Sequence, residues 1–452
     1  MEPPPYDSFA DAPLLSSNNG TSSEPPAYDR GLTPPPIAIQ LGEVREFTSE
    51  IQTGDGTPWA ILTIQGDRRL SKTMPTVLEG SNLVGSVKFL LESSESIHAI
   101  CILIRGELLK SKDGATTIPF FESKHTLWPV EGTSQVSTKF RKGDYNWPFS
   151  LPIPATFIKE GKLFRLPQFF SDLRAIFRIQ YVAELRVVRG KLQPDDKVAR
   201  TFGYFSMKQP GPPSALRQLA YQENSPLLGP TADHEGWTSQ SASVKGDLFS
   251  SRQIELKFTL SLATPLSYTR QTCIPCALAI DTEDAHAFGL LTTPAACMVY
   301  LERTSRQNDE KLEWTQTVEP CGRAVFHPST EGAPDYSARR LMGEIRLRVD
   351  LQPSFAIFGF QVEVWPHLVT FFATILSDFY SKYAVVVFPF QAAGFKPLDS
   401  GPVLRLDVEI VTRYAPGPRQ KMYTAPSQET RNPAIDRYYQ SLAQRSASVN
   451  FV

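Results

Sequence analysis

Apolar and polar residues alternate one by one along several stretches of the sequence. The clearest stretch is 178–188, and the same pattern returns in 254–262, 345–351 and 404–410. Successive side chains of a β-strand point to opposite faces, so this period places one face against a core and the other toward water. Strands of this kind are typical of antiparallel sheets. The alternation therefore predicts an all-β fold.

The strand-like stretches fall into two groups, separated by a segment that is rich in proline and serine. The first group covers 59–208 and the second covers 244–415. The segment between them, 209–243, begins with a Pro-Gly-Pro-Pro run. A chain of 452 residues is long for a single core. We therefore predict two consecutive antiparallel β-sandwich domains of the immunoglobulin-like type, joined by an inter-domain linker at 209–243.

Both ends of the sequence lack a clear alternation. Residues 1–58 are predicted to form a disordered, proline-rich N-terminal tail, and residues 416–452 a disordered C-terminal tail. One short helix is an alternative within the second tail, because Asn432 and Pro433 form a typical helix start. The residues that would form its apolar stripe are Ile435, Tyr438, Tyr439 and Leu442.

The N-terminal tail carries the pattern PPxY twice. The defining residues are Pro3, Pro4 and Tyr6 in the first copy and Pro25, Pro26 and Tyr28 in the second. Adjacent prolines favour a polyproline helix that docks on an aromatic groove, which is how WW domains bind peptides. Tyr6 and Tyr28 are 22 positions apart, a separation that a spacer of this composition would span with a mean distance on the order of 25 Å. The two copies predict a bivalent WW-binding segment, and the alternative is a proline-rich tail that contains tyrosines by chance.

The overall composition argues against several classes of protein. The formal net charge is −1, so no general attraction to nucleic acid is expected. The sequence starts without the basic and apolar segments of a signal peptide, and five scattered cysteines do not form a disulfide framework. We expect a cytoplasmic protein.

Cys273 and Cys276 form a CxxC pattern. A zinc site would need a second pair of ligands at a matching spacing, and the sequence offers none. We predict buried structural thiols, no metal, no cofactor and no enzyme activity. A redox or metal enzyme based on this pair is the remote alternative.

Two weaker signals concern regulation and sorting. Ser71 follows Arg68-Arg69-Leu70 and is a candidate phosphorylation site, the alternative being a solvated basic turn. Glu223, Leu227 and Leu228 fit an acidic dileucine pattern, although leucine pairs in linkers usually pack.

The segment 361–382 is an unexpected apolar insert in the second predicted sandwich. Its apolar part is bounded by Glu363 and Asp378, which leaves too few residues for a membrane span. Either it is a helix that docks on the sandwich or touches a membrane, or it comes from an unspliced or misannotated segment, which we prefer.

Several segments resemble the α-arrestins, the family of proteins with an arrestin-like N-terminal domain, in their fungal type. They are Leu83–Val87, Ile97–Gly106, Tyr145–Pro152, Phe177–Arg189, Pro213–Gly229, Leu260–Tyr268, Pro353–Ile357 and Tyr383–Phe390. The resemblance covers about residues 59–415 and is strengthened by the two PPxY motifs.

The resemblance implies a non-enzymatic adaptor that recruits a HECT-type ubiquitin ligase through its WW domains. The cargo would be a membrane transporter or receptor, ubiquitinated and sorted for endocytosis. Such a protein would be cytoplasmic and transiently present at the plasma membrane or endosomes. The alternative is a retromer-like sorting scaffold that acts through sheet edges and does not need a ligase.

Overall fold

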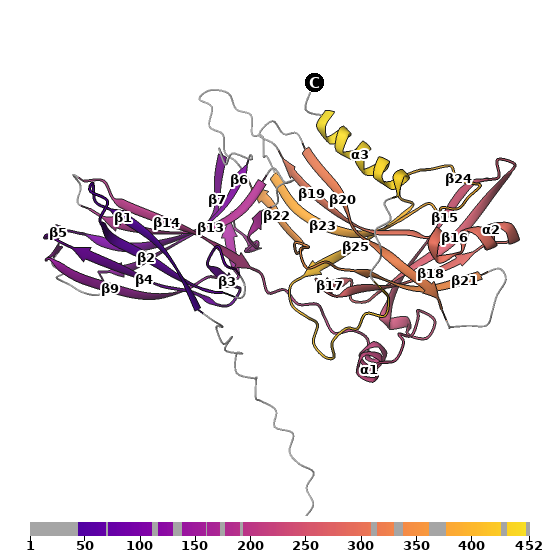
Figure 1. Ribbon diagram of the computed structural model, residues 1–452, viewed down its shortest axis with the longest axis horizontal. Helices are drawn as coiled ribbons and strands as arrows, with labels where there is room; N and C mark the ends of the chain where they lie inside the picture. The colour runs from indigo at the N-terminus through magenta and orange to yellow at the C-terminus, as the bar shows by residue number, and fades with distance from the viewer. Residues whose placement is uncertain are drawn as a thin grey trace, which may run out of the picture. The chain divides into compact units, whose positions relative to one another are not determined.

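The computed structural model describes residues 44–448, apart from 69–70, 111–115, 130–137, 160, 172–176, 190–192, 309–313, 330–337, 361–376 and 426–431. These described residues are mostly β-strands with few helices, so the all-β prediction is confirmed (Figure 1). Residues 43–452 form one compact unit. It contains two large hydrophobic clusters.

The first hydrophobic cluster lies between a four-stranded and a six-stranded sheet. The four-stranded sheet has the order β1 (Val44–Gln52), β2 (Pro58–Asp67), β4 (Asn82–Leu91), β9 (Gly143–Pro152). The six-stranded sheet has the order β3 (Thr76–Leu78), β14 (Asp196–Phe205), β13 (Phe177–Val188), β6 (Ala99–Lys110), β7 (Thr116–Trp128), and β12 (Phe170–Ser171) pairs with β13. Two short two-stranded sheets complete this part, β5 (Glu95–Ser96) with β8 (Lys139–Phe140) and the hairpin of β10 (Thr156–Lys159) with β11 (Lys162–Arg165).

The second cluster is enclosed by a sheet of eleven strands. Its order is β17 (Ser267–Thr269), β25 (Leu404–Val411), β23 (Ser377–Phe388), β19 (Met298–Asn308), β20 (Trp314–Pro328), β21 (Ala338–Arg346), β18 (Cys273–Asp281), β16 (Arg252–Ala263), β15 (Trp237–Leu248), β24 (Phe395–Pro397), with β22 (Phe355–Phe360) paired to β23. β20 pairs with β19 along its first part and with β21 along its last five residues. A single strand therefore joins the two layers that enclose this core.

The alternating stretches form the strands that they predict. β13 covers the stretch 178–188, and its inward residues Ile179, Tyr181, Ala183, Leu185 and Val187 are fully buried. β16 and β25 likewise cover 254–262 and 404–410. The stretch 345–351 behaves differently, because β21 ends at Arg346 and Val349 is 62% exposed.

The predicted N-terminal tail of 1–58 is too long. β1 begins at Val44 and pairs with β2 over its whole length. Among its apolar residues only Phe47 is buried, at 5% exposure, so the strand leaves a weak pattern in the sequence. Residues before 44 lie outside the described part of the chain.

The predicted linker, 209–243, contains regular structure. The helix α1 (Ala215–Glu223) begins after Ser214, whose hydroxyl accepts a hydrogen bond from the Arg217 amide, and ends at Asn224, which has a left-handed backbone conformation. A 3-10 turn at His234–Gly236 leads directly into β15 at Trp237. The serines of β15 pair with hydroxyls of β16, at 2.7 Å for Ser239–Ser261, so this strand is polar on one face. A serine-rich segment of this kind is also typical of a linker, which is why the sequence predicts a linker that extends to residue 243.

The prediction of a disordered tail over 416–452 is wrong, and its helix alternative is confirmed. α3 (Pro433–Ser448) lies over β19, β20 and β23 (Figure 1). Ile435 and Tyr439 are buried against Met298, Tyr300 and Phe388 in a third hydrophobic cluster. Here both faces of β23 are covered, which explains its unbroken apolar run from Ala384 to Phe388.

The predicted insert at 361–382 is only partly described. Residues 361–376 lie outside the described part of the chain. Residues 377–382 belong to β23, which pairs with β22 and β19 and therefore is an ordinary strand of the sheet. Two other helical elements, α2 (Ala285–Leu291) and the 3-10 turn Pro294–Ala296, connect β18 to β19.

Candidate functional site

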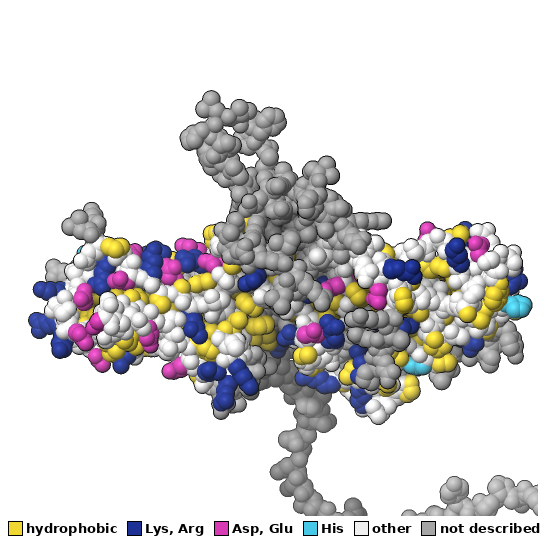
Figure 2. Space-filling view, turned by 45° about the horizontal axis from the view of Figure 1, so that its top comes forward, with side chains coloured by type: hydrophobic (Ala, Val, Ile, Leu, Met, Phe, Trp, Pro, Cys, Tyr) yellow, Lys and Arg dark blue, Asp and Glu magenta, His cyan; other side chains and the backbone are white. Residues whose placement is uncertain are grey.

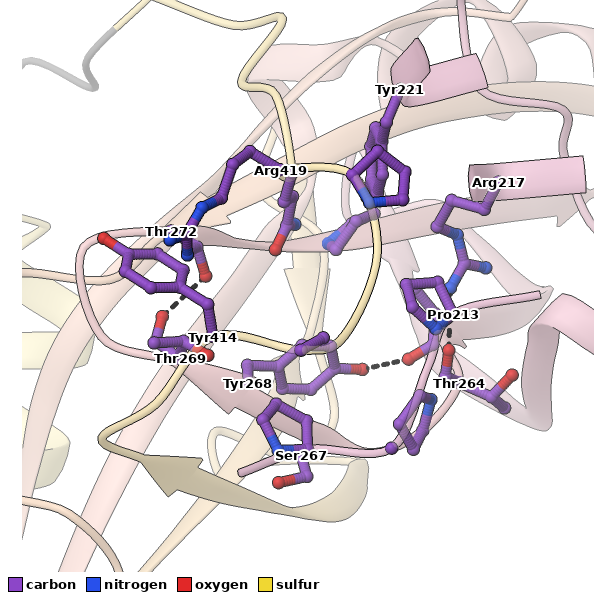
Figure 3. Close-up of a pocket in the computed structure, with 18 residues that line it drawn as sticks. Pro213, Arg217, Tyr221, Thr264, Ser267, Tyr268, Thr269, Thr272, Tyr414 and Arg419 are labelled. Carbon is purple, nitrogen blue, oxygen red and sulfur yellow. Dashed lines mark hydrogen bonds between the residues drawn. The ribbon is translucent and has the colours of Figure 1, made fainter. Parts of the chain in front are cut away.

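A small hollow lies where α1, the β16–β17 corner and the segment 414–420 meet (Figure 3). Its volume is about 50 Å³, which has room for a few water molecules and is far below the roughly 300 Å³ of a typical small-molecule site. The hollow is therefore a joint between chain segments, and its side chains show how the joint is held.

Arg217 of α1 is the central side chain of this joint. It is 5% exposed, and its guanidinium donates hydrogen bonds to the Thr264 carbonyl at 2.8 Å and to the Gly236 carbonyl. The same group lies 5.1 Å above the centre of the Trp237 ring. Burial lowers the pKa of Arg217 below its usual value. The planar guanidinium thus fastens α1 to β15 and to the end of β16.

Two tyrosines form the buried wall of the joint. The Tyr268 hydroxyl donates a hydrogen bond to the Ala263 carbonyl (Figure 3), and Tyr221 lies one helical turn after Arg217. Burial raises the pKa of both phenols well above the usual range, so both stay protonated at physiological pH.

The segment 414–425 holds α1 against the sheet from the other side. The buried Glu344 carboxylate accepts hydrogen bonds from the Tyr423 and Thr424 amides, each at 3.0 Å. The Lys421 ammonium donates to the Asn224 side chain at 2.8 Å. A carboxylate that accepts two backbone N–H groups makes strong, charge-assisted hydrogen bonds. Residues 414–425 are therefore an integral strap of the fold.

Cys273 and Cys276 are both buried, as predicted, but the two thiols do not lie together in one site. Cys276 belongs to the second hydrophobic core, while the Cys273 thiol accepts a hydrogen bond from Gln420 of the strap at 3.2 Å. Positions three apart in a strand face opposite sides of the sheet. Burial raises the pKa of both thiols, which keeps them protonated. Among the described residues, no group of three His, Cys, Asp or Glu could hold a metal ion.

Of the weaker signals, the structure describes Ser71 and the dileucine pattern, while Arg69 and Leu70 lie outside the described residues. The Ser71 hydroxyl accepts hydrogen bonds from the Thr73 and Met74 amides, both at 3.2 Å, and so stabilises the turn after β2. In the dileucine pattern, Glu223 ends α1, Leu227 is half-buried and Leu228 is 42% exposed. Phosphorylation of Ser71 and recognition of the leucines stay predictions.

A buried carboxylate marks the contact between α3 and the sheet. Glu302 is 1% exposed and accepts hydrogen bonds from the Tyr439 hydroxyl and from Arg405, each at 2.9 Å. Burial raises the pKa of Glu302, and these two partners lower it by less. The protonated form is therefore favoured more in the folded than in the unfolded chain.

Replacing Glu302 by glutamine should change how stability depends on pH. Because the folded pKa is raised above the unfolded value, the contribution of Glu302 to stability is present at low pH and is lost as pH rises through the folded pKa. Relative to Glu302→Gln, the unchanged protein should lose stability as the pH rises above the usual value for a glutamate, ~4.5, and through the raised pKa of Glu302, as measured by urea unfolding. Asp407→Asn is the matched control, because the Asp407 side chain also pairs with Arg405 but is 82% exposed. The opposite slope would contradict this account.

The six residues of the PPxY motifs lie outside the described part of the chain, so the structure places none of them. On the face that Figure 2 shows, acidic and basic side chains are interspersed, in keeping with a net charge of −1. None of the helices that the structure describes is long and apolar enough to cross a bilayer. No protein-family model matches the chain, and no curated protein matches it.

Proposed function

We propose that this protein is a non-enzymatic adaptor that recruits a HECT-type ubiquitin ligase to membrane-protein cargo. The observation that carries the proposal is the pair of PPxY motifs at Tyr6 and Tyr28. Each motif combines a low-entropy proline segment with a tyrosine for the second pocket of a WW domain. Two copies in one short segment suit a ligase that has several WW domains.

The rest of the chain supports this proposal as the part that would hold the cargo. The described residues are all-β, with two large hydrophobic cores and long strands. The resemblance of 59–415 to α-arrestins agrees with this division, and implies that the two cores correspond to two arrestin-like sandwiches. The adaptor would be cytoplasmic and would reach the plasma membrane or endosomes when it binds a transporter or receptor.

Retention of the full chain on an immobilised tandem WW domain tests the proposal. We expect the unchanged protein to be retained and Tyr6→Ala/Tyr28→Ala to pass through, because the alanines cannot fill the tyrosine pocket. Ala27→Ser preserves the PPxY pattern and is the matched control. Equal retention of the double variant would refute the proposal. If cargo internalisation in cells also survived deletion of residues 1–36, the retromer-like alternative would be favoured.

A further inference from the structure

β7 forms a long edge of the six-stranded sheet. It has 13 residues, more than β1 or β9, which end the four-stranded sheet. One side of β7 pairs with β6, and none of the strands that the structure describes pairs with its other side. The outer side of an edge strand carries N–H and C=O groups that can bind a further strand. β7 is therefore a candidate site for strand addition.

Only part of this edge is protected against strand addition. Glu107 of β6 pairs with Pro119 and Gly106 pairs with Phe121, which leaves Phe120 as the additional residue of a bulge. A proline and a bulge both hinder the pairing of an edge strand with another strand. From Phe121 to Thr126 the register with β6 is continuous, and this part contains neither proline nor glycine. The segment 121–126 is thus the part of β7 that another strand can extend.

The two faces of the segment 121–126 differ in burial. The half-buried side chains are those of Phe121, Ser123 and His125, and the exposed ones are those of Glu122, Lys124 and Thr126. Phe121 packs against the first hydrophobic cluster, and the Ser123 hydroxyl lies 2.9 Å from Nε2 of His125. Burial lowers the pKa of His125 below its usual value, so its ring is uncharged at neutral pH. A matching strand must therefore present a half-buried, uncharged face, and an exposed face that pairs with one acid and one base.

The same segment of a second copy meets these requirements. In antiparallel pairing about a two-fold axis at Ser123, Glu122 of each copy lies opposite Lys124 of the other. Phe121 then lies opposite His125, so half-buried side chains meet on one face and exposed side chains on the other. Opposite charges and aromatic rings directly across two strands stabilise the pairing. An axis at Glu122 or at Lys124 would instead place like charges opposite each other, so the charges select the register about Ser123.

We propose that β7 is a dimerisation edge, at which a second copy of the chain pairs antiparallel about Ser123 and continues the six-stranded sheet across the two-fold axis. Two short strands bury little surface, so the dimer should form reversibly and depend on protein concentration. Each copy would bring its own two PPxY motifs to the dimer. That consequence rests on the proposed function, whereas the dimer itself does not.

Analytical ultracentrifugation of the full chain over a range of concentrations tests the proposal. We expect a reversible dimer for the unchanged protein. Lys124→Glu or Glu122→Lys should each weaken it at least about tenfold, because like charges then lie opposite each other twice in the dimer. Lys257→Glu reverses an exposed lysine of β16, away from this edge, and is the matched control. An unchanged protein that sediments as a monomer at every concentration would overturn the proposal.

A charge exchange tests the register itself. In an equimolar mixture of Lys124→Glu and Glu122→Lys, the two acidic side chains of one copy face the two basic side chains of the other, so a mixed dimer should form. Glu122→Lys/Lys124→Glu in one chain restores both pairs and should dimerise like the unchanged protein, which also shows that the exchanged residues permit folding. A dimer that neither single variant weakens would lie on another surface and refute the proposal. A mixture and a double variant that both stay monomeric would refute it as well.

Discussion

Replacing Gly85 by alanine should destabilise the protein by roughly 2–3 kcal/mol, because a side chain has no room where β2, β4 and β9 meet. A Cβ atom at this position would lie 2.1 Å from the Thr63 carbonyl oxygen and 2.6 Å from Cζ of Phe149. The first contact is with backbone, and Phe149 is buried in the first hydrophobic core. Neither neighbour can move without disturbing its strand. Urea unfolding at a fixed pH measures the loss.

Gly289→Ala provides the matched control for this prediction. Gly289 lies in α2, and a Cβ atom there would meet nothing within 4 Å. Alanine favours helix over glycine, so this variant should be more stable by about 0.5–1 kcal/mol. The same chemical change should thus have opposite signs at the two positions. If Gly85→Ala were as stable as the unchanged protein, or more stable, the close packing of β4 between β2 and β9 would be contradicted.

Tyr28→Ala alone should lower the affinity of the full chain for two linked WW domains by about 10²–10⁴-fold. The loss is this large because linkage makes binding of the second motif intramolecular. Once one tyrosine is absent, only one motif binds and the gain from linkage is lost. For an isolated WW domain the same change should reduce the apparent affinity by only about twofold. Titration calorimetry with one and with two WW domains measures both values.

Two further variants sharpen the test of bivalence. Tyr6→Ala should behave like Tyr28→Ala on the linked pair, whereas Ala27→Ser should bind like the unchanged protein. If either single alanine variant kept the full affinity for the linked domains, the two motifs would not act as a bivalent site. The adaptor proposal would then rest on one motif alone.

The strands with one face in the core could be predicted from the sequence. β13, β16 and β25 alternate because one face lies in the core and the other carries mostly polar side chains, although Val182 and Glu184 on the outer face of β13 are themselves buried. β1 and β15 were missed for different reasons. β1 buries little besides Phe47, and the exposed face of β15 is polar, with Ser239 and Ser241 paired to hydroxyls of β16. Burial on both faces also removes the alternation, as in β23 beneath α3.

The joint around Arg217 could not be predicted, because its partners are far away in the sequence. Arg217 binds the carbonyl of Thr264, 47 positions later, and Glu344 binds amides about 80 positions later. Backbone carbonyl acceptors and backbone amide donors occur at nearly every residue, so neither contact leaves a pattern in the sequence. Arg217 in the predicted linker is the one signal that the sequence offers, and a charged residue in a linker is ordinarily solvated.

β20 restricts where new chain termini can be introduced. At its bulge, Leu301 pairs with Gly322 and Glu302 pairs with Pro320, which leaves Cys321 as the additional residue. This point lies just before the strand changes partner from β19 to β21. New termini created at Cys321 by circular permutation would divide the hydrogen-bond ladder of one layer from that of the other. Termini placed beyond Trp314 or Pro328 would keep both ladders on a continuous backbone.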